Sequence, residues 1–317
     1  MSLDLHRPLA VDLFSGAGGL SLGLEQAGYE IAASVEYDPI HAAVHEFNFP
    51  YGCTLVRDVS KITGEDIRKE SEIEDKEIAL VSGGPPCQGI SLIGRRAIDD
   101  PRNSLLKEYV RLVVELKPRY FLMENVAGLT VGKHRRLLDE VVSMFDGAGY
   151  RVLTPYKVLQ AADYGTPQSR KRLILLGSRS DVPPPEYPEP AFFPRSVRPG
   201  GDVLLEGRSL SEYMSLGLKE SITLGPSVAD ALGDLPNADD FADLLVSDEV
   251  HTCRYGEPSL YASVLRSLIH ERENFSHARP VEPNWMTSAS RTAHTKKSIE
   301  RFRQTRPGMI EPVSRFL

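Results

Sequence analysis

The stretch Val11-Asp12-Leu13-Phe14-Ser15-Gly16-Ala17-Gly18-Gly19-Leu20 decides the fold. An apolar run passes into a glycine-rich turn and then into a helix-like segment, which is the pattern of a β-strand, a tight turn and an α-helix. Glycines let the backbone approach a ligand closely, and the N-terminus of the following helix favours negative charge. The dinucleotide fingerprint needs a third glycine at position 21, where this chain has Ser21, and this weakens a nicotinamide-dinucleotide interpretation.

Strand-like runs and helix-like stretches alternate over residues 1–180. The predicted strands are Leu9–Phe14, Ile31–Glu36, Thr54–Asp58, Ile78–Ser82, Tyr120–Glu124, Arg151–Gln160 and Leu173–Gly177. The predicted helices are Gly19–Ala27, Pro39–Phe47, Asn103–Leu116 and Lys133–Phe145. This alternation predicts an α/β fold with a Rossmann-like, mostly parallel sheet and helices on both faces. Ligands of such sheets bind beyond the carboxyl ends of the strands.

The character of the chain changes after Asp181. Six prolines lie between residues 183 and 194, which indicates a linker or an irregular excursion. From there to Leu317 the periodicity is weak and turn residues are frequent. We therefore predict two domains, residues 1–181 and a smaller, irregular one over residues 182–317.

Composition and cysteine usage exclude several classes of protein. The chain has 317 residues, of which 41% are hydrophobic and 26% charged, and no apolar run is long enough for a transmembrane helix. The N-terminus lacks the apolar core of a secretion signal. Cys53, Cys87 and Cys253 are too few for a disulfide framework, and their spacing matches no zinc site, so we expect no bound metal. A reducing cytoplasm is the simplest compartment.

Charge is unevenly distributed. The net charge of −7 argues against a wholly basic nucleic-acid binder. Residues 228–249 contain seven acids and no Lys or Arg, whereas residues 291–306 contain six basic residues against one acid, Glu300. The basic run is either a solvated helix face or a phosphate-binding surface, and both interpretations stay open at this point.

Acidic residues follow the second and third predicted strands. Glu36 ends the second strand 20 residues after Gly16, where a carboxylate can accept hydrogen bonds from ribose hydroxyls. Asp58 ends the third strand and could accept from an exocyclic amine of a base. Together with the glycine loop, these two positions favour a nucleoside-containing cofactor over a merely structural turn.

A cysteine loop follows the fourth predicted strand, in Val81-Ser82-Gly83-Gly84-Pro85-Pro86-Cys87-Gln88. Free cysteines are usually small buried hydrophobes, and we keep that interpretation for Cys53 and Cys253. Cys87 differs because a rigid turn brings it to the ligand-binding end of the sheet. A thiol whose pKa is lowered there by dipoles or cations becomes a nucleophile.

Two further groups of polar residues belong to the same edge. Glu124 directly follows an apolar run beside Asn125, which makes it a candidate proton donor. Arg170 and Arg172 alternate with Lys171, so their guanidinium groups share one face of an extended backbone. A paired arginine face suits a carboxylate, a phosphate or a base carbonyl.

These residues together resemble the cytosine carbon-5 DNA methyltransferase family. The motifs that carry the resemblance are Asp12–Gly19, Glu36, Asp58, Pro85-Pro86-Cys87-Gln88, Glu124-Asn125-Val126 and Gln168-x-Arg170-x-Arg172. They follow the family's order over residues 9 to about 178. Pro-Pro-Cys followed 37 residues later by Glu-Asn-Val is highly specific.

The resemblance implies methyl transfer from S-adenosylmethionine to carbon 5 of a cytosine flipped out of double-stranded DNA, which leaves S-adenosylhomocysteine. Cys87 would add to carbon 6 of the base while Glu124 protonates ring nitrogen 3. Arg172 would bind the base and Arg170 would help to order the site. Asn125 would buttress the cysteine loop.

The resemblance also implies a mobile catalytic loop over Gln88–Arg102, to which Gln88 and Ser91 would contribute, and a set of cofactor contacts. The implied cofactor-binding residues are Phe14, Ser15, Gly16, Gly18, Gly19, Leu20, Glu36, Tyr37, Asp58, Val59, Pro86 and Leu105.

The match breaks in the C-terminal part. Family members carry two more blocks after the recognition region, an Arg-x-Thr/Ser-type strand and a Gly-Asn-x-Val element that completes the cofactor pocket. Residues 306–317 resemble the run-up to these blocks, so we expect neither block in this sequence. Residues 182–317 would then be a linker and part of a target-recognition domain. We expect either the larger chain of a split enzyme, completed by a second chain, or a truncated or incompletely represented protein.

Three functional hypotheses remain. The first is an active DNA methyltransferase, and the intact catalytic residues favour it. The second is a non-catalytic cofactor- or DNA-binding remnant, and the third is an RNA cytosine methyltransferase with the same chemistry. No motif in the sequence identifies the DNA target site or a partner restriction enzyme.

Overall fold

The computed structural model describes residues 7–86, 104–193, 196–197, 203–204, 223–252, 254–279, 284–287 and 289–305. Its contacts divide the chain into two units. The first comprises residues 1–160, 170–189 and 271–279, and the second comprises residues 161–169, 190–270 and 280–317. Each unit is therefore made of three separate stretches of the chain, and the boundary between the units does not fall once after Asp181. The prediction of two domains, residues 1–181 and 182–317, stays a prediction.

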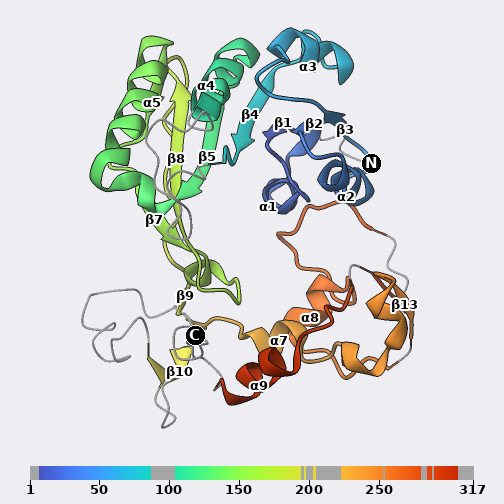
Figure 1. Cartoon of the computed structure of the whole chain (residues 1–317). Coiled ribbons are helices and arrows are strands. Elements are labelled where there is room, and N and C mark those ends of the chain that lie inside the picture. The colour runs from blue at the N-terminus through green and yellow to red at the C-terminus, as the bar shows by residue number, and fades with distance from the viewer. Residues whose placement is uncertain are drawn as a thin grey trace. The chain divides into compact units, whose positions relative to one another are not determined.

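The first unit is built on one eight-stranded sheet with the order β3-β2-β1-β4-β5-β8-β6, and β7 also pairs with β8 (Figure 1). The strands are β1 (Leu9–Leu13), β2 (Glu30–Glu36), β3 (Cys53–Val56), β4 (Ile78–Gly83), β5 (Tyr120–Val126), β6 (Tyr150–Val152), β7 (Lys157–Gln160) and β8 (Lys171–Arg179). Strands β1 to β5 are parallel, and β8 is antiparallel to β5, β6 and β7. This arrangement confirms the predicted mostly parallel, Rossmann-like sheet.

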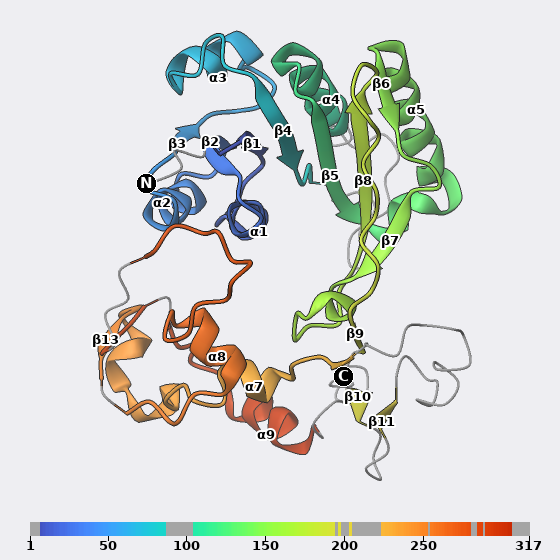
Figure 2. The same ribbon diagram turned by 180° about the vertical axis from the view of Figure 1, so that it is seen from behind.

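Helices cover both faces, as the alternation of strand residues requires (Figure 2). Residues such as Val11, Val81 and Phe121 point into the main core, which is closed by α3 (Gly64–Glu70), α4 (Ser104–Leu116) and α5 (Arg135–Gly147). The neighbouring strand positions Ala10, Ile31 and Leu80 point the other way. They pack against Leu24 of α1 (Gly19–Gln26) and against Phe49, which caps α2 (Pro39–Asn48).

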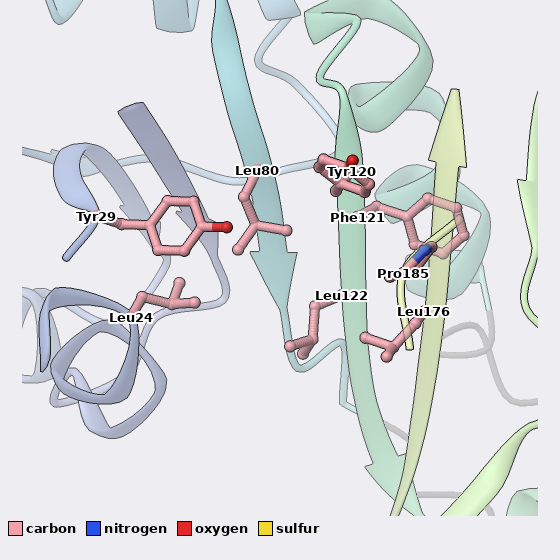
Figure 3. Close-up of a pocket in the computed structure, with 8 residues that line it drawn as sticks. All are labelled: Leu24, Tyr29, Leu80, Tyr120, Phe121, Leu122, Leu176 and Pro185. Carbon is pink, nitrogen blue, oxygen red and sulfur yellow. The ribbon is translucent and has the colours of Figure 1, made fainter. Parts of the chain in front are cut away.

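Part of this second face is open. A pocket of about 320 Å³ lies there, and the side chains that line it are apolar apart from the hydroxyls of Tyr29 and Tyr120 (Figure 3). The lining residues are Leu24, Tyr29, Leu80, Tyr120, Phe121, Leu122, Leu176 and Pro185. Most of them come from the interior and amino-terminal parts of the strands, so this pocket is distinct from the edge at which the sequence places the functional residues.

Two predictions of secondary structure are corrected. A strand predicted over residues 151–160 is two strands, β6 and β7, because Pro155 lacks the N–H that a continuous ladder needs. Helix α3 was not predicted at all. It is short, but Thr63 and Asp66 form a reciprocal capping box at its start, and Ile67 is fully buried against the core.

The second unit consists of short elements, in keeping with its weak periodicity. Its described elements are η4 (Ala161–Tyr164), β9 (Phe192–Phe193), β10 (Ser196–Val197), β11 (Val203–Leu204), β12 (Thr223–Leu224), α7 (Val228–Leu232), η5 (Ala238–Asp240), η6 (Ala242–Leu245), β13 (Val250–His251), α8 (Leu260–Leu265), β14 (Trp285–Met286) and α9 (Lys296–Gln304). Leu244 and Ala262 are buried in it. None of the helices that the structure describes is long and apolar enough to cross a bilayer.

Candidate active site

The strand order places two of the predicted motifs at a topological switch point of the sheet. The order reverses between β1 and β4, so the chain leaves these neighbouring strands toward opposite sides. The glycine loop (residues 14–19) follows β1, and Gly84-Pro85-Pro86 follows β4. Parallel α/β sheets bind ligands at such a switch point.

The glycine loop turns sharply and is tied to the end of β2. Three of its residues, Phe14, Gly16 and Gly18, have positive φ angles of 59°, 55° and 95°. The Gly16 N–H donates to Oε2 of Glu36 at 2.8 Å, and the Asp38 N–H donates to Oε1 at 2.9 Å. Each carboxylate oxygen can accept a further hydrogen bond, so Glu36 can hold the loop and still accept from ribose hydroxyls.

Three features of the loop and of the end of β2 fit a bound nucleoside cofactor. The hydroxyl oxygen of Ser15 is buried and has no hydrogen-bond partner among the residues that the structure describes, so a ligand with a donor or an acceptor there would satisfy this hydroxyl. The side chain of Tyr37, immediately after Glu36, is 74% exposed and is free to lie against an aromatic base. Gly16 and Gly19 have no atom near the position of a Cβ, so the backbone is open to close approach there.

The remaining predicted cofactor residues differ in their burial and in their distance from the strand ends. Asp58 lies two residues beyond the end of β3, and the side-chain and backbone donors of Ser60 lower its pKa. The Val59 side chain is buried in the main core, so only its backbone can face a ligand. Leu105 lies in the first turn of α4, half-buried against the core. Leu20 and Pro86 are half-buried, and Gly18 is buried.

The predicted acid and one predicted arginine form an ion pair. Because β8 runs antiparallel to β5, its start lies at the carboxyl end of β5, and Arg172 is in register with Val126. The Arg172 Nε lies 2.7 Å from Glu124 Oε1, with the two side chains 23% and 31% exposed. Oε2 of Glu124 lies 3.4 Å from where a Cβ of Gly84 would be, so the carboxylate adjoins the cysteine loop.

Asn125 links the same strand end to that loop. Its side chain is buried, its Nδ2 donates to the Pro85 carbonyl at 3.0 Å, and its Oδ1 accepts from the Val126 N–H at 2.9 Å. Cys87 follows Pro86 directly in sequence, but Cys87, Gln88 and Ser91 lie outside the described residues. The anchor that Asn125 gives to Pro85 is therefore two residues from the predicted nucleophile.

Arg170 does not take part in the ion pair of Glu124 and Arg172. It is exposed just before β8 begins, and none of the residues that the structure describes forms an ion pair with it. An exposed guanidinium at this position can meet a phosphate or a base. In the part of the chain that is described, no three His, Cys, Asp or Glu side chains come together as a metal site.

The sequence analysis missed a buried polar network beneath the glycine loop. Asp12 accepts from Ser21 at 2.5 Å and from Ser82 at 2.8 Å, and both serines are fully buried. Nε2 of His45 lies 3.0 Å from the Ser21 hydroxyl, and its Nδ1 lies 3.1 Å from the hydroxyls of Ser34 and Thr54. A neutral His45 protonated on Nε2 lets every member donate and accept consistently.

Burial controls the charges in this network. Desolvation lowers the pKa of His45 to about 4, which keeps the ring neutral near neutral pH. Desolvation also raises the pKa of Asp12, against the hydrogen bonds from Ser21 and Ser82. A signal was available in the sequence, because Asp12 and Ser82 interrupt the apolar runs of two strands and face each other in register.

Comparison with known proteins decides the family. The model of the family described as C-5 cytosine-specific DNA methylase matches residues 10–246. The chain belongs to this family. The resemblance read from its motifs is thereby confirmed.

Individual relatives agree with the assignment. Type II methyltransferase M.XorII of Xanthomonas oryzae is 46% identical over 312 residues, which are 98% of this chain and 66% of the relative. Type II methyltransferase M.AquIA of Picosynechococcus is 34% identical over 235 residues, which are 72% of this chain and 89% of the relative. Type II methyltransferase M1.HphI of Haemophilus parahaemolyticus is 41% identical, over 57% of this chain and 48% of the relative. The chain thus spans half to two thirds of the length of two of these three relatives.

A solved structure shows the same fold. A protein encoded within an E. coli prophage and assigned as a DNA modification methyltransferase superposes with a TM-score of 0.66 and 27% sequence identity. The superposition covers 97% of this chain and 78% of that one. The Rossmann-like fold predicted from the strand-helix alternation is shared by this family neighbour.

Proposed function

We propose that this member of the C-5 cytosine-specific DNA methylase family transfers a methyl group from S-adenosylmethionine to carbon 5 of a cytosine in double-stranded DNA. One observation carries the proposal. The Glu124–Arg172 ion pair adjoins Gly84 in the loop that leads to Cys87, at the carboxyl edge of the sheet whose glycine loop is tied to Glu36. An acid and the approach to a thiol therefore stand at the edge where a cofactor would bind.

The cofactor would be held by the glycine loop and by Glu36, Tyr37 and Asp58, and it supplies an electrophilic methyl group. The unpartnered Ser15 hydroxyl and the exposed Tyr37 ring support this assignment. The acidic groups Glu36 and Asp58 suit the hydroxyls and the amine of an adenosine.

The chain's own residues would divide the work on the base. The Cys87 thiolate forms a bond to carbon 6, and Glu124 gives a proton to ring nitrogen 3, so the electron pair of the 5,6 double bond becomes nucleophilic at carbon 5. Arg172 holds one oxygen of Glu124 and leaves the other toward Gly84. Carbon 5 would bond to the methyl group as the sulfur–methyl bond breaks, which leaves S-adenosylhomocysteine. Water then takes the carbon-5 proton, the electrons of that bond re-form the 5,6 double bond, the thiolate leaves carbon 6, and ring nitrogen 3 returns its proton to Glu124.

A stacked cytosine is out of reach of a protein thiol, so the base must leave the duplex at a cost of a few kcal/mol. The exposed Arg170 and the basic residues of α9 are the groups that we assign to holding DNA. The Type II relatives support a role in a restriction–modification system, and we place the reaction in the cytoplasm.

A second candidate function stays open. It is that of a non-catalytic cofactor- or DNA-binding remnant, or of a subunit that needs a second chain. RNA cytosine methylation shares every residue of the mechanism. Parallel assays with DNA and RNA of the same sequence separate these alternatives.

The decisive experiment traps the covalent step on DNA that contains 5-fluorocytosine. Fluorine cannot leave as a cation, so the wild-type chain, together with a polypeptide that carries the Gly-Asn-x-Val and Arg-x-Thr/Ser blocks, should form an adduct that survives denaturation in the presence of S-adenosylmethionine. Cys87→Ser should form none, and Cys53→Ser, which removes the half-buried cysteine at the start of β3, should still form it. An adduct with Cys87→Ser, or none with the wild type and its second chain, would refute the proposal.

A further inference from the structure

A segment from late in the chain packs on the helices of the first unit. Residues 271–279 are grouped with the sheet, although the residues on both sides of them belong to the second unit. The Phe275 N–H donates to the Gln26 carbonyl at 3.0 Å. His277 donates its N–H to Glu25 at 3.2 Å, and its Nε2 lies 3.0 Å from Glu30.

Arg279, at the end of this segment, joins α1 to the C-terminal end of α2. It pairs with Glu25 of α1, whose side chain is only 3% exposed. Its Nε donates to the Asn48 carbonyl at 2.8 Å, and its guanidinium carbon lies 4.9 Å from the centre of the Phe49 ring. A guanidinium suits this position because it can donate in several directions and stack on an aromatic face at once.

The end of α2 that Arg279 holds is also the support of the glycine loop. The Asn48 Nδ2 donates to the Ala17 carbonyl at 3.3 Å. The Phe49 ring lies against Gly18 so closely that a Cβ there would be 2.2 Å from its Cε2. Phe49 also stacks on His45 with a centroid distance of 4.6 Å, and His45 leads into the Ser21–Asp12 network.

We infer that Arg279 is a positioning residue for cofactor binding, acting on the glycine loop through Asn48 and Phe49. The inference rests on the proposed function for the identity of the ligand, and on the contacts alone for the control of the loop. Gly18 has a φ of 95° and the Phe49 ring directly beneath it, so a shift of that ring changes the loop. A ligand held by backbone groups is sensitive to such a shift because its contacts require the loop in one conformation.

The test removes the Arg279 contacts without leaving a buried charge. In the double variant Arg279→Met with Glu25→Gln, the methionine keeps an apolar stem over Phe49, and the glutamine can still accept from His277. The matched control is Arg266→Met with Asp234→Asn in the second unit. Arg266 and its buried partner Asp234 are 24% and 1% exposed, and Arg266 lies 4.2 Å from the Tyr255 ring, so the two pairs are alike in burial and stacking.

Two measurements distinguish a positioning role of Arg279 from a purely structural one. Calorimetric binding of S-adenosylhomocysteine should weaken about tenfold in the Arg279 variant and stay within twofold of wild type in the Arg266 control. Hydrogen exchange of the backbone amides of residues 15–22 should become faster in the Arg279 variant only. A structural role without positioning would lower thermal stability equally in both variants and move neither readout, and that outcome would overturn the inference.

The exchange measurement keeps the two claims separate. If the wild-type chain binds no S-adenosylhomocysteine even with a polypeptide that carries the Gly-Asn-x-Val and Arg-x-Thr/Ser blocks, the proposed function fails, while faster exchange of residues 15–22 in the Arg279 variant would still uphold the control of the loop. If the wild type binds and neither affinity nor exchange changes, the inference fails and the proposed function stands. Faster exchange in both variants would mean general loosening, and it too would contradict a specific role of Arg279.

Discussion

Glu124 is the residue on which the proposed chemistry depends most directly among those described. Its pairing with Arg172 at 2.7 Å fixes the carboxylate beside Gly84, and the register of β5 with β8 makes that pairing possible. The sequence predicted both residues from their positions at strand ends. It did not predict their direct contact, because the antiparallel direction of β8 cannot be read from an isolated run of residues.

We expect Glu124→Gln to lose methyl-transfer activity by about 10²- to 10⁴-fold, since a general acid contributes on that order. The amide keeps the shape of the side chain but cannot give up a proton in the same way, so DNA affinity should be retained. Single-turnover methylation with tritiated cofactor measures the loss. Glu108→Gln is the control, because Glu108 pairs with Arg111 at the same 2.7 Å within α4, at a similar exposure of the two side chains. A loss below tenfold would assign Glu124 a structural role.

His45 gives the first unit a pH dependence of known sign. Its pKa in the folded state, about 4, lies below the ordinary value of 6.5, because burial disfavours the charged ring. The unfolded chain therefore binds a proton before the folded chain does as the pH falls. The stability contributed by the neutral ring is complete above about pH 6.5 and is lost progressively down to about pH 4.

The expected loss attributable to His45 over this window is about 3 kcal/mol in the free energy of unfolding, from 1.36 kcal/mol for each pKa unit. Urea unfolding at a series of pH values measures it. His45→Gln keeps a polar side chain that cannot titrate, so its free energy of unfolding should fall less steeply between pH 6.5 and 4 than that of the wild type. Parallel curves for the two proteins would show that His45 is not the titrating group.

At the scale of elements, periodicity predicted most of the first unit. Strands β1, β2, β4 and β5 and helices α1, α2, α4 and α5 lie within a few residues of their predicted positions, because buried parallel strands are apolar runs and their helices are amphipathic. Helix α3 was not predicted because only one of its seven residues, Ile67, is a buried aliphatic residue, and because its start is fixed by a capping box. Local side-chain capping is a weaker signal than a repeated apolar face.

Helix α9 carries the basic run that the sequence left ambiguous. It begins after Thr295, which caps it through a hydrogen bond to the Ser298 N–H, and has no buried residue. Lys296 and Lys297 lie in its first turn, and Arg301 and Arg303 lie in its last. With a DNA substrate proposed, we expect these side chains to contact phosphates.

Replacing Lys296 and Lys297 together by Ala should lower the slope of log affinity against log salt by about 0.9 for each phosphate that no longer has a basic partner. DNA-binding titrations at several salt concentrations measure the slope. The control is Lys69→Ala with Lys76→Ala, which removes the same charge from the end of α3 and the turn after it. If the affinity and slope of the α9 variant equal those of the wild type, the run is only a solvated face.

At the scale of the whole molecule, sequence reasoning failed where distant segments meet. Nothing in a local pattern predicts that residues 271–279 pack with α1 and α2, about 250 positions earlier in the chain. The buried Glu25 was read as part of an ordinary helix, since its partner Arg279 could not be foreseen. The family motifs could be found because they follow strand ends, whereas the residues that support them come from elsewhere.

The last prediction concerns what the chain does alone. The family resemblance implies that a Gly-Asn-x-Val block beside the glycine loop completes the cofactor pocket. The segment shared with this chain makes up 66% of the Xanthomonas relative. We expect the 317-residue polypeptide by itself to bind S-adenosylmethionine weakly and to methylate DNA poorly. A second polypeptide that carries the Gly-Asn-x-Val and Arg-x-Thr/Ser blocks should restore methylation and raise the melting temperature, since a partner that binds only the folded state stabilises it.

Methyl incorporation by the purified chain, with and without that polypeptide, measures the effect, and a polypeptide in which the Gly-Asn-x-Val block is replaced by alanines is the control. Restoration by the intact polypeptide alone would assign the effect to that block. Full activity of the 317-residue chain without any addition would contradict the prediction, and it would mean that residues of this chain close the cofactor pocket themselves. In that case the segment around Arg279, which already reaches the support of the glycine loop, is the first place to look for them.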